Sequence, residues 1–198
     1  MRICVLCEDE AWKSLFTGQA VTLLDADHAT DVLSDDVLFD LRDEAWDLER
    51  YQQYHGPVFL AAVIGTRAEH KAPSHVIRIN AWPGMLTRPA VEAVGDPSIR
   101  PAAEFILANL GKTVAWVDDL VGMVSPRVIA MIINEAGFAW EEGVSQKASI
   151  DVAMRLGTNY PLGPFEWGTM IGWHRLKQLQ KALAKEAGLY QPSQTLSS

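Results

Sequence analysis

The first half of the chain consists of short apolar runs separated by polar segments. Apolar runs of about four to eight residues are typical of strands that are buried on both faces of a sheet. Segments with helical spacing lie between these runs, and such an alternation indicates a Rossmann-like parallel sheet. The pattern predicts strands at residues 2–7, 21–24, 37–41, 58–64, 75–81, 88–94 and 112–117, and helices at residues 10–17, 44–54 and 96–110.

The second half of the chain has the apolar spacing of helices. Its pattern predicts a long helix from Ser125, which is suited to cap it, to Gly143, which is suited to end it. A short helix at residues 149–156, ended by Gly157, and an amphipathic helix at residues 173–187 follow. The polar tail is expected to fray. We therefore expect two domains, at residues 1–119 and 120–198.

Four short motifs follow one another in the helical half. They read Asn134-Glu135-Ala136, Glu141-Glu142-Gly143, Ile150-Asp151-x-Ala153-Met154 and Tyr160-Pro161-x-Gly163-Pro164-Phe165-Glu166. With these motifs in this order, residues 111–189, and more weakly 77–110, resemble the C-terminal part of 3-hydroxyacyl-CoA dehydrogenases. The resemblance implies a truncated Rossmann-like α/β domain followed by a helical domain of the dehydrogenase C-terminal type. It also implies fatty-acid metabolism, an acyl-CoA ligand, NAD as a possible cofactor, and a homodimer formed through the helical domain.

The family moves a proton with a histidine that a glutamate holds in position. By resemblance, Ile77 stands at the histidine position, whereas Asn80 and Glu92 match the family's asparagine and glutamate. The turn between them is about three residues longer than the family's. His75 is predicted to point to the same face as Ile77 and is a candidate substitute base; alternatively, it is a solvent-facing histidine at a strand end. A carboxylate in an otherwise apolar strand needs a partner, so a functional role is expected for Glu92.

Four further residues are candidates for substrate contact. The resemblance places a substrate-binding serine after the fourth predicted strand, where Thr66 is the nearest hydroxyl. It places an orienting asparagine at Pro126, which has no side-chain donor, and Ser125 is the adjacent hydroxyl. Asn159 and Tyr160 belong to the proline- and glycine-rich turn that packs near the acyl-binding cleft in the family. This turn serves either the architecture alone or ligand contact.

The turn after the first predicted strand bears on the cofactor. Dinucleotide-binding folds use glycines there, so that the backbone can approach the pyrophosphate. Residues 6–11 contain no glycine and include three consecutive acidic residues, which would repel a pyrophosphate. Asp25 or Asp27 stands where a ribose-binding acid is expected, although both also fit a plain acidic loop. NAD therefore remains possible by resemblance, but the glycine loop is absent.

Composition argues against nucleic acid, membranes and metal ions as partners. The formal net charge of −8 argues against nucleic acid, whose phosphates bind clustered Lys and Arg. The sequence has no apolar run of about 18 residues, the length that suggests a membrane span, so no membrane partner is expected. Cys4 and Cys7, the only cysteines, have no further nearby ligands. We expect them to be core cysteines of a cytoplasmic protein and expect no metal site.

Three functions are compatible with these observations. The first is a 3-hydroxyacyl-CoA dehydrogenase with an altered site that uses Glu92, Asn80 and His75. The second, which the missing histidine and glycine loop favour, is a relative with a degenerate active site that binds acyl-CoA and has reduced or no NAD-dependent activity. The third is a non-catalytic partner that uses its helices to pair with itself or with a full-length dehydrogenase.

Overall fold

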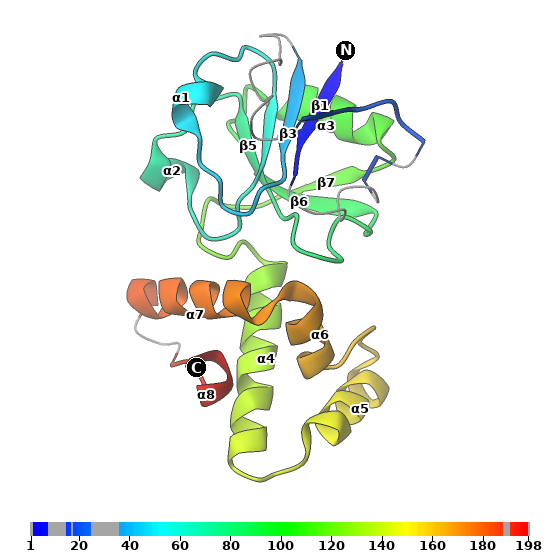
Figure 1. Ribbon diagram of the computed structural model, residues 1–198, viewed down its shortest axis with the longest axis vertical. Helices are drawn as coiled ribbons and strands as arrows, with labels where there is room; N and C mark the ends of the chain where they lie inside the picture. The colour runs from blue at the N-terminus through cyan, green and yellow to red at the C-terminus, as the bar shows by residue number, and fades with distance from the viewer. Residues whose placement is uncertain (1, 8–14, 17, 25–35, 188–190, 198) are drawn as a thin grey trace. The chain divides into compact units, whose positions relative to one another are not determined.

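The structure, a computed structural model, describes residues 2–7, 15–16, 18–24, 36–187 and 191–197. The chain divides into two compact units, Met1–Met123 and Val124–Ser198. The first unit contains a β-sheet with helices, and the second unit is helical (Figure 1). In the described part of the chain, no helix has both the length and the apolar character needed to cross a membrane.

The N-terminal unit is built on one seven-stranded sheet, in the order β2-β1-β3-β4-β5-β6-β7. All neighbouring strands are parallel except β5 and β6, which are antiparallel. The predicted fold class, a Rossmann-like parallel sheet followed by a helical domain, is confirmed. The strands are β1 (Ile3–Leu6), β2 (Thr22–Leu24), β3 (Val37–Asp40), β4 (Val58–Ala61), β5 (Val76–Ile79), β6 (Ala90–Val94) and β7 (Thr113–Trp116).

Both faces of the central strands are covered, which explains why their sequences are continuously apolar. Helix α3 (Arg100–Asn109) packs on the face formed by residues such as Phe39, Phe59 and Ile77. On the other face, α1 (Leu48–Tyr51) packs against a second cluster. A longer helix at residues 44–54 was expected, but α1 has a single turn, and Glu44 before it has a left-handed φ of 53°. Helix α2 (Arg67–His70) follows β4.

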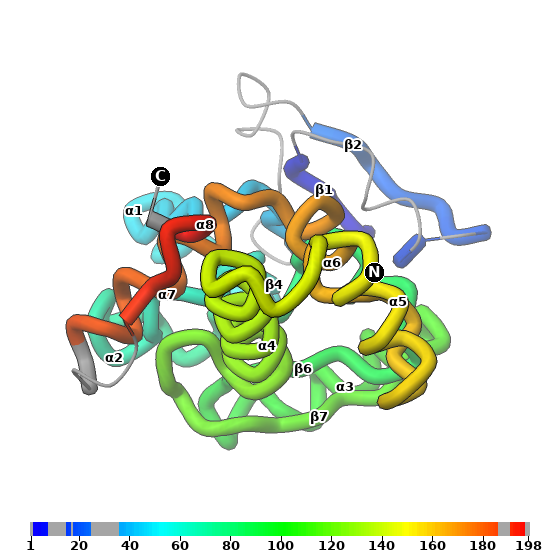
Figure 2. Tube along the Cα trace, turned by 90° about the horizontal axis from the view of Figure 1, so that it is seen from below, coloured from blue at the N-terminus to red at the C-terminus, as the bar shows by residue number. Residues whose placement is uncertain are grey.

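The C-terminal unit is organised around the long helix α4 (Ser125–Glu141). Helix α4 contacts each of the other four helices of the unit, and Figure 2 shows them around it. It buries small and apolar residues such as Ala130, Ile133 and Gly137. The other helices are α5 (Lys147–Thr158), α6 (Pro164–Ile171), α7 (Trp173–Ala187) and α8 (Gln194–Ser197).

Three predicted helix ends differ from the structure by one or two residues. Ser125 is the first residue of α4, and the N-cap position belongs to Val124, so Ser125 does not cap the helix. Helix α5 starts at Lys147, earlier than predicted, and continues through Gly157. Asn159 ends it instead, in a left-handed conformation with φ 56°. Asparagine adopts this conformation more readily than most residues other than glycine, so it can also terminate a helix.

The tail does not fray as expected but docks on α4. The side-chain amide of Asn134 donates to the carbonyl of Gln191 (3.0 Å) and accepts from the backbone N–H of Ser193 (2.8 Å). Leu196 is buried, with 2% of its surface exposed. Gly137 makes room for the tail, because a Cβ atom there would lie 2.4 Å from Ser193 Oγ. The prediction failed because these partners lie more than 50 residues away along the chain.

Candidate functional site

The candidate site lies where β1, β3, β4 and β5 end, which we call the carboxyl edge of the sheet. Ligands of open α/β sheets bind at this edge, next to the point where the strand order reverses. Here that point lies between β1 and β3, because β2 is on one side of β1 and β3 is on the other. Three charged residues lie at this edge: Asp40 on β3, Glu44 in the segment after β3, and Arg78 on β5.

Asp40 is the last residue of β3 and is fully buried. Its carboxylate accepts hydrogen bonds from Arg42 Nε (2.9 Å) and from the Tyr51 hydroxyl (2.9 Å). The Arg42 Nη2 group completes an ion pair with it. Burial, together with the nearby Asp40 charge, raises the pKa of Tyr51, so its hydroxyl stays a donor. The carboxylate at the switch point is therefore bound by two side chains of the protein itself, Arg42 and Tyr51.

Glu44 occupies the end of β4. Its Oε1 accepts from the backbone N–H groups of Val63 (2.5 Å) and Ile64 (2.6 Å), and its Oε2 accepts from that of Gly65 (2.9 Å). Its own backbone N–H donates to the carbonyl of Ala61 (2.9 Å). Burial raises the pKa of Glu44 above its ordinary range, and the three backbone donors oppose this only in part.

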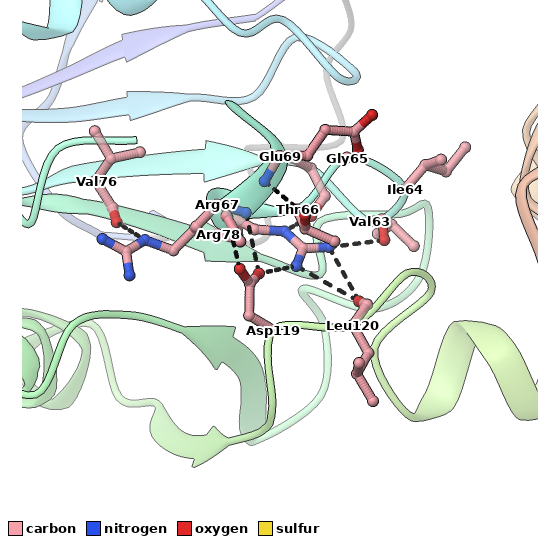
Figure 3. A network of polar contacts seen from close by, with 12 residues as sticks. Val63, Ile64, Gly65, Thr66, Arg67, Glu69, Val76, Arg78, Asp119 and Leu120 are labelled. Carbon is pink, nitrogen blue, oxygen red and sulfur yellow. Dashed lines mark hydrogen bonds and ion pairs between the residues drawn. The ribbon is translucent and has the colours of Figure 1, made fainter. Parts of the chain in front are cut away.

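Arg78 projects from β5 and has the largest fully buried side chain among the residues that the structure describes. Its guanidinium donates to the carbonyl oxygens of Ala62 (3.1 Å) and Val63 (2.9 Å). It also forms an ion pair with Asp119 and reaches the carbonyl of Leu120 (Figure 3). Burial lowers the pKa of Arg78, although the Asp119 carboxylate opposes this shift. Arg78 thus joins the end of β4 to the segment that follows β7.

The Asp119 carboxylate has two further donors, the backbone N–H groups of Arg67 (3.1 Å) and Ala68 (2.9 Å) (Figure 3). Burial raises the pKa of Asp119, but the backbone donors and Arg78 outweigh this effect and hold the pKa below its ordinary range. The Arg67 side chain donates to the carbonyl oxygens of Val76 (2.9 Å) and Pro73 (3.0 Å). The network therefore links β5, α2 and the segment after β7.

Asn80 and Glu92 lie opposite each other at the end of β5. The Asn80 N–H donates to the Glu92 carbonyl (3.0 Å), and the antiparallel register of β5 and β6 agrees with this pairing. Residues directly opposite in such a pair have their side chains on the same face. Ile77 is buried on the other face, in the cluster beneath α3.

This arrangement decides which residue lies opposite Glu92. Ile77 does not face Glu92; Asn80 does, because alternate residues of a strand point to opposite faces. The residue that faces Glu92 is therefore Asn80, whose amide does not take up a proton near neutral pH.

The structure does not bring His75 to these two residues. Its ring Nε2 lies 2.8 Å from the carbonyl oxygen of Tyr51, on the α1 side of the sheet. His75 precedes β5, whereas Asn80 follows it, and the two are separated by roughly 16 Å along an extended strand. His75 therefore contacts the backbone at the opposite end of β5.

The other candidate residues are dispersed. Thr66 lies at the carboxyl edge, where its hydroxyl oxygen caps α2 by accepting from the Glu69 N–H (3.1 Å). Ser125 begins α4, and Asn159 and Tyr160 are exposed at the end of α5. Both cofactor candidates, Asp25 and Asp27, lie outside the described residues. In the described ranges no group of three or more His, Cys, Asp or Glu side chains is arranged to hold a metal ion.

The sequence reasoning missed the charged groups of the carboxyl edge, although a signal was present for two of them. Asp40 and Arg78 interrupt apolar strands, as Glu92 does, and such residues need partners once they are buried. Glu44 and Asp119 gave no such signal, because both lie in polar segments. Only the folded chain places them beside the ends of β4 and β5.

Comparison with known proteins identifies the helical unit. Residues 122–198 match the family model described as 3-hydroxyacyl-CoA dehydrogenase, C-terminal domain. Over 113 residues the chain is 42% identical to a 3-hydroxyadipyl-CoA dehydrogenase of Escherichia coli, and these residues are 57% of this chain and 24% of the relative. A 3-hydroxybutyryl-CoA dehydrogenase of Bradyrhizobium diazoefficiens is 39% identical over 80 residues, which are 40% of this chain and 27% of the relative. The matched segment thus spans about a quarter of the length of these relatives.

Solved structures show the same fold over more of the chain. The (S)-3-hydroxybutyryl-CoA dehydrogenase from Ralstonia eutropha aligns with a TM-score of 0.78 at 18% identity, over 99% of this chain and 92% of that one. A 3-hydroxybutyryl-CoA dehydrogenase from Escherichia coli aligns with a TM-score of 0.61 at 32% identity, over 73% of this chain and 31% of that one. The first likeness is one of fold alone, while the second extends to sequence.

Proposed function

Since residues 122–198 match the C-terminal domain of 3-hydroxyacyl-CoA dehydrogenases, we propose that the chain is an acyl-CoA-binding protein of fatty-acid metabolism with reduced or no NAD-dependent activity. Its relatives are named for dehydrogenase activity on hydroxyacyl-CoA substrates. The proposal transfers the ligand class from these relatives, but not the full reaction.

One observation carries the proposal: the residue that faces Glu92 is Asn80. In the family's reaction a histidine at this place moves the proton while a glutamate supports its charged form. An amide cannot replace it in this role. Loss of a general base costs about two to four orders of magnitude in rate, so activity without it is expected to be low.

The carboxyl edge supports the same conclusion. Asp40 is paired with Arg42, and Arg78 is paired with Asp119. The Glu44 carboxylate accepts hydrogen bonds from the three backbone N–H groups after β4. These groups are committed to the architecture and are poorly suited to exchange partners with a nucleotide during turnover. The competing proposal, an enzyme with a rebuilt site, requires Glu92 to act as the base without an imidazole partner.

The test measures NADH oxidation by the purified protein with acetoacetyl-CoA, alongside binding of acetoacetyl-CoA by isothermal titration. We expect acyl-CoA binding without NADH oxidation above the background of the assay. A Glu92→Gln variant and an exposed control, Glu49→Gln, accompany the wild type. Turnover that is lost in Glu92→Gln but kept in the control would refute the reduced-activity proposal. Absence of both binding and turnover would refute the acyl-CoA assignment.

A second proposal concerns self-association through the C-terminal unit. Val152 (43% exposed) and Leu156 (83% exposed) lie one helical turn apart on α5, and Tyr160 (39% exposed) follows the end of this helix. Val144, in the segment before α5, is 70% exposed. Exposed apolar side chains in such a row mark interaction surfaces, and we propose that a second copy of this chain covers them.

Light scattering coupled to size-exclusion chromatography tests this assembly. We expect a dimer for the wild type and a monomer for Leu156→Asp, because the substitution places a charge in the apolar row. Gln178→Asp, on the exposed side of α7, is the matched control and should remain dimeric. A monomeric wild type at high micromolar concentration would refute self-association through this surface.

A further inference from the structure

Three consecutive backbone N–H groups at the end of β4 point to one place. The N–H groups of Val63, Ile64 and Gly65 all donate to the carboxylate of Glu44, at 2.5, 2.6 and 2.9 Å. Successive backbone N–H groups that converge in this way form a nest, which is a general site for anions in proteins. The nest lies at the carboxyl edge, where ligands of α/β sheets bind.

The surroundings of the nest are tightly packed. The rings of Trp46 and His70 stack at a centroid distance of 4.1 Å and an interplanar angle of 9°. A Cβ atom on Gly65 would lie 2.5 Å from Trp46 Nε1 and 2.8 Å from His70 Nε2. Glycine is therefore required at the third donor, and the aromatic pair forms a wall beside it.

Glu44 reaches the nest from a backbone conformation that is unfavourable for its residue type. Its φ of 53° is left-handed, a conformation that is unfavourable for residues other than glycine. Its N–H donates to the carbonyl of Ala61, so that the backbone and side chain of one residue both bind the end of β4. The contacts with the nest are what compensate for this conformation.

We infer that the backbone nest of Val63, Ile64 and Gly65 is a carboxylate-binding site whose resident ligand is the chain's own Glu44. The carboxylate has the position and the contacts that a free carboxylate ligand would have. The site is therefore closed in the wild type and opens when the Glu44 side chain is removed. The inference does not rest on the proposed acyl-CoA function, because it concerns a different group of donors and a different ligand.

A Glu44→Ala variant makes the inference testable with acetate as the probe. The substitution removes the Cγ methylene group and the carboxylate, and acetate supplies a carboxylate with one attached carbon. The melting temperature is measured with increasing sodium acetate, and sodium chloride keeps the ionic strength constant. We expect Glu44→Ala to melt several degrees below the wild type and acetate to restore a large part of the difference. The wild type and Glu49→Ala, an exposed control, should not respond.

Hydrogen exchange then locates the effect. Hydrogen bonds to charged groups contribute about 1.5–3 kcal/mol, so the amides of Val63, Ile64 and Gly65 are expected to exchange roughly ten to a hundredfold faster in Glu44→Ala. Acetate should protect these three amides again. Glu44→Gln retains the shape of the side chain and provides a folded reference if the alanine variant fails to fold. Its amide oxygen can serve the nest, so its three amides should stay better protected than those of Glu44→Ala and should not respond to acetate.

Two results would overturn the inference. One is an equal acetate response in the wild type, Glu49→Ala and Glu44→Ala, which would mean that acetate acts on the whole protein. The other is exchange at the three amides that is unchanged by the loss of the Glu44 carboxylate in both Glu44 variants. Inorganic phosphate is measured in parallel, because protection by phosphate but not by acetate would refute the carboxylate as the preferred class.

Discussion

The ion pair between Arg78 and Asp119 offers a quantitative test of how the N-terminal unit is held together. Asp119→Asn removes the negative charge and keeps nearly the same shape. The Arg78 side chain is 0% exposed and that of Asp119 is 27% exposed. Removal of one partner of a buried pair costs about 3–5 kcal/mol, because the other charge stays buried without compensation. Since Asp119 is partly exposed, we expect a loss of about 2–3 kcal/mol in the free energy of unfolding.

Chemical denaturation of the full chain, followed by tryptophan fluorescence, measures this loss. A second variant, Arg78→Met, and the double variant complete a mutant cycle. If the uncompensated charge causes the loss, the double variant will be more stable than the sum of the single effects predicts. An Asp119→Asn variant within about 0.5 kcal/mol of the wild type, or strictly additive effects, would refute this explanation.

The same pair predicts a dependence on pH. The folded-state pKa of Asp119 lies below its ordinary range, so the carboxylate stabilises the fold above the unfolded-state pKa of about 3.9. This contribution is lost as the pH falls through the folded-state pKa. The stability difference between the wild type and Asp119→Asn should therefore be constant near neutral pH and shrink in acid below about pH 4. A difference that persists unchanged at pH 2–3 would contradict the assignment of the shift to this pair.

Two further predictions concern glycine and left-handed positions. Gly137→Ala places a Cβ atom 2.4 Å from Ser193 Oγ, so we expect the free energy of unfolding to fall by about 1–3 kcal/mol. Limited digestion should then cleave residues 191–197 faster than in the wild type, and a tail that stays intact would contradict the role of Gly137. Lys71 ends α2 at a φ of 50° and is exposed. Lys71→Gly should therefore raise the free energy of unfolding by up to about 1 kcal/mol, as measured in denaturant titrations. A decrease would show that the lysine side chain stabilises the fold more than its left-handed backbone destabilises it.

Part of the fold follows from local sequence. The helical spacing of α4 and α7 predicts helices because burial of one face imposes a period on the chain, and the continuous apolar runs predict strands that are covered on both faces. Gly143, in a left-handed conformation at φ 76°, ends the long helix as predicted. The motifs of the helical half were enough to predict the C-terminal domain that residues 122–198 match, since the turn from Tyr160 to Glu166 consists of residues that are close in sequence.

Other features were decided only when distant segments met. The docking of the tail depends on Asn134 and Gly137, which are more than 50 residues away from it along the chain. The register of β5 and β6 placed Asn80, and not Ile77, opposite Glu92. A change of a few residues in the assumed turn moves a side chain to the other face of the sheet, so the spacing alone could not settle this assignment.

The charged groups at the carboxyl edge show the same division. The sequence by itself determined that Arg78 and Asp40 interrupt apolar strands and therefore need partners. The tertiary structure decided which partners they have: Asp119 for Arg78, and Arg42 with Tyr51 for Asp40. Periodicity is a property of neighbouring residues, whereas an ion pair or a backbone nest depends on the distance between segments that only folding brings together.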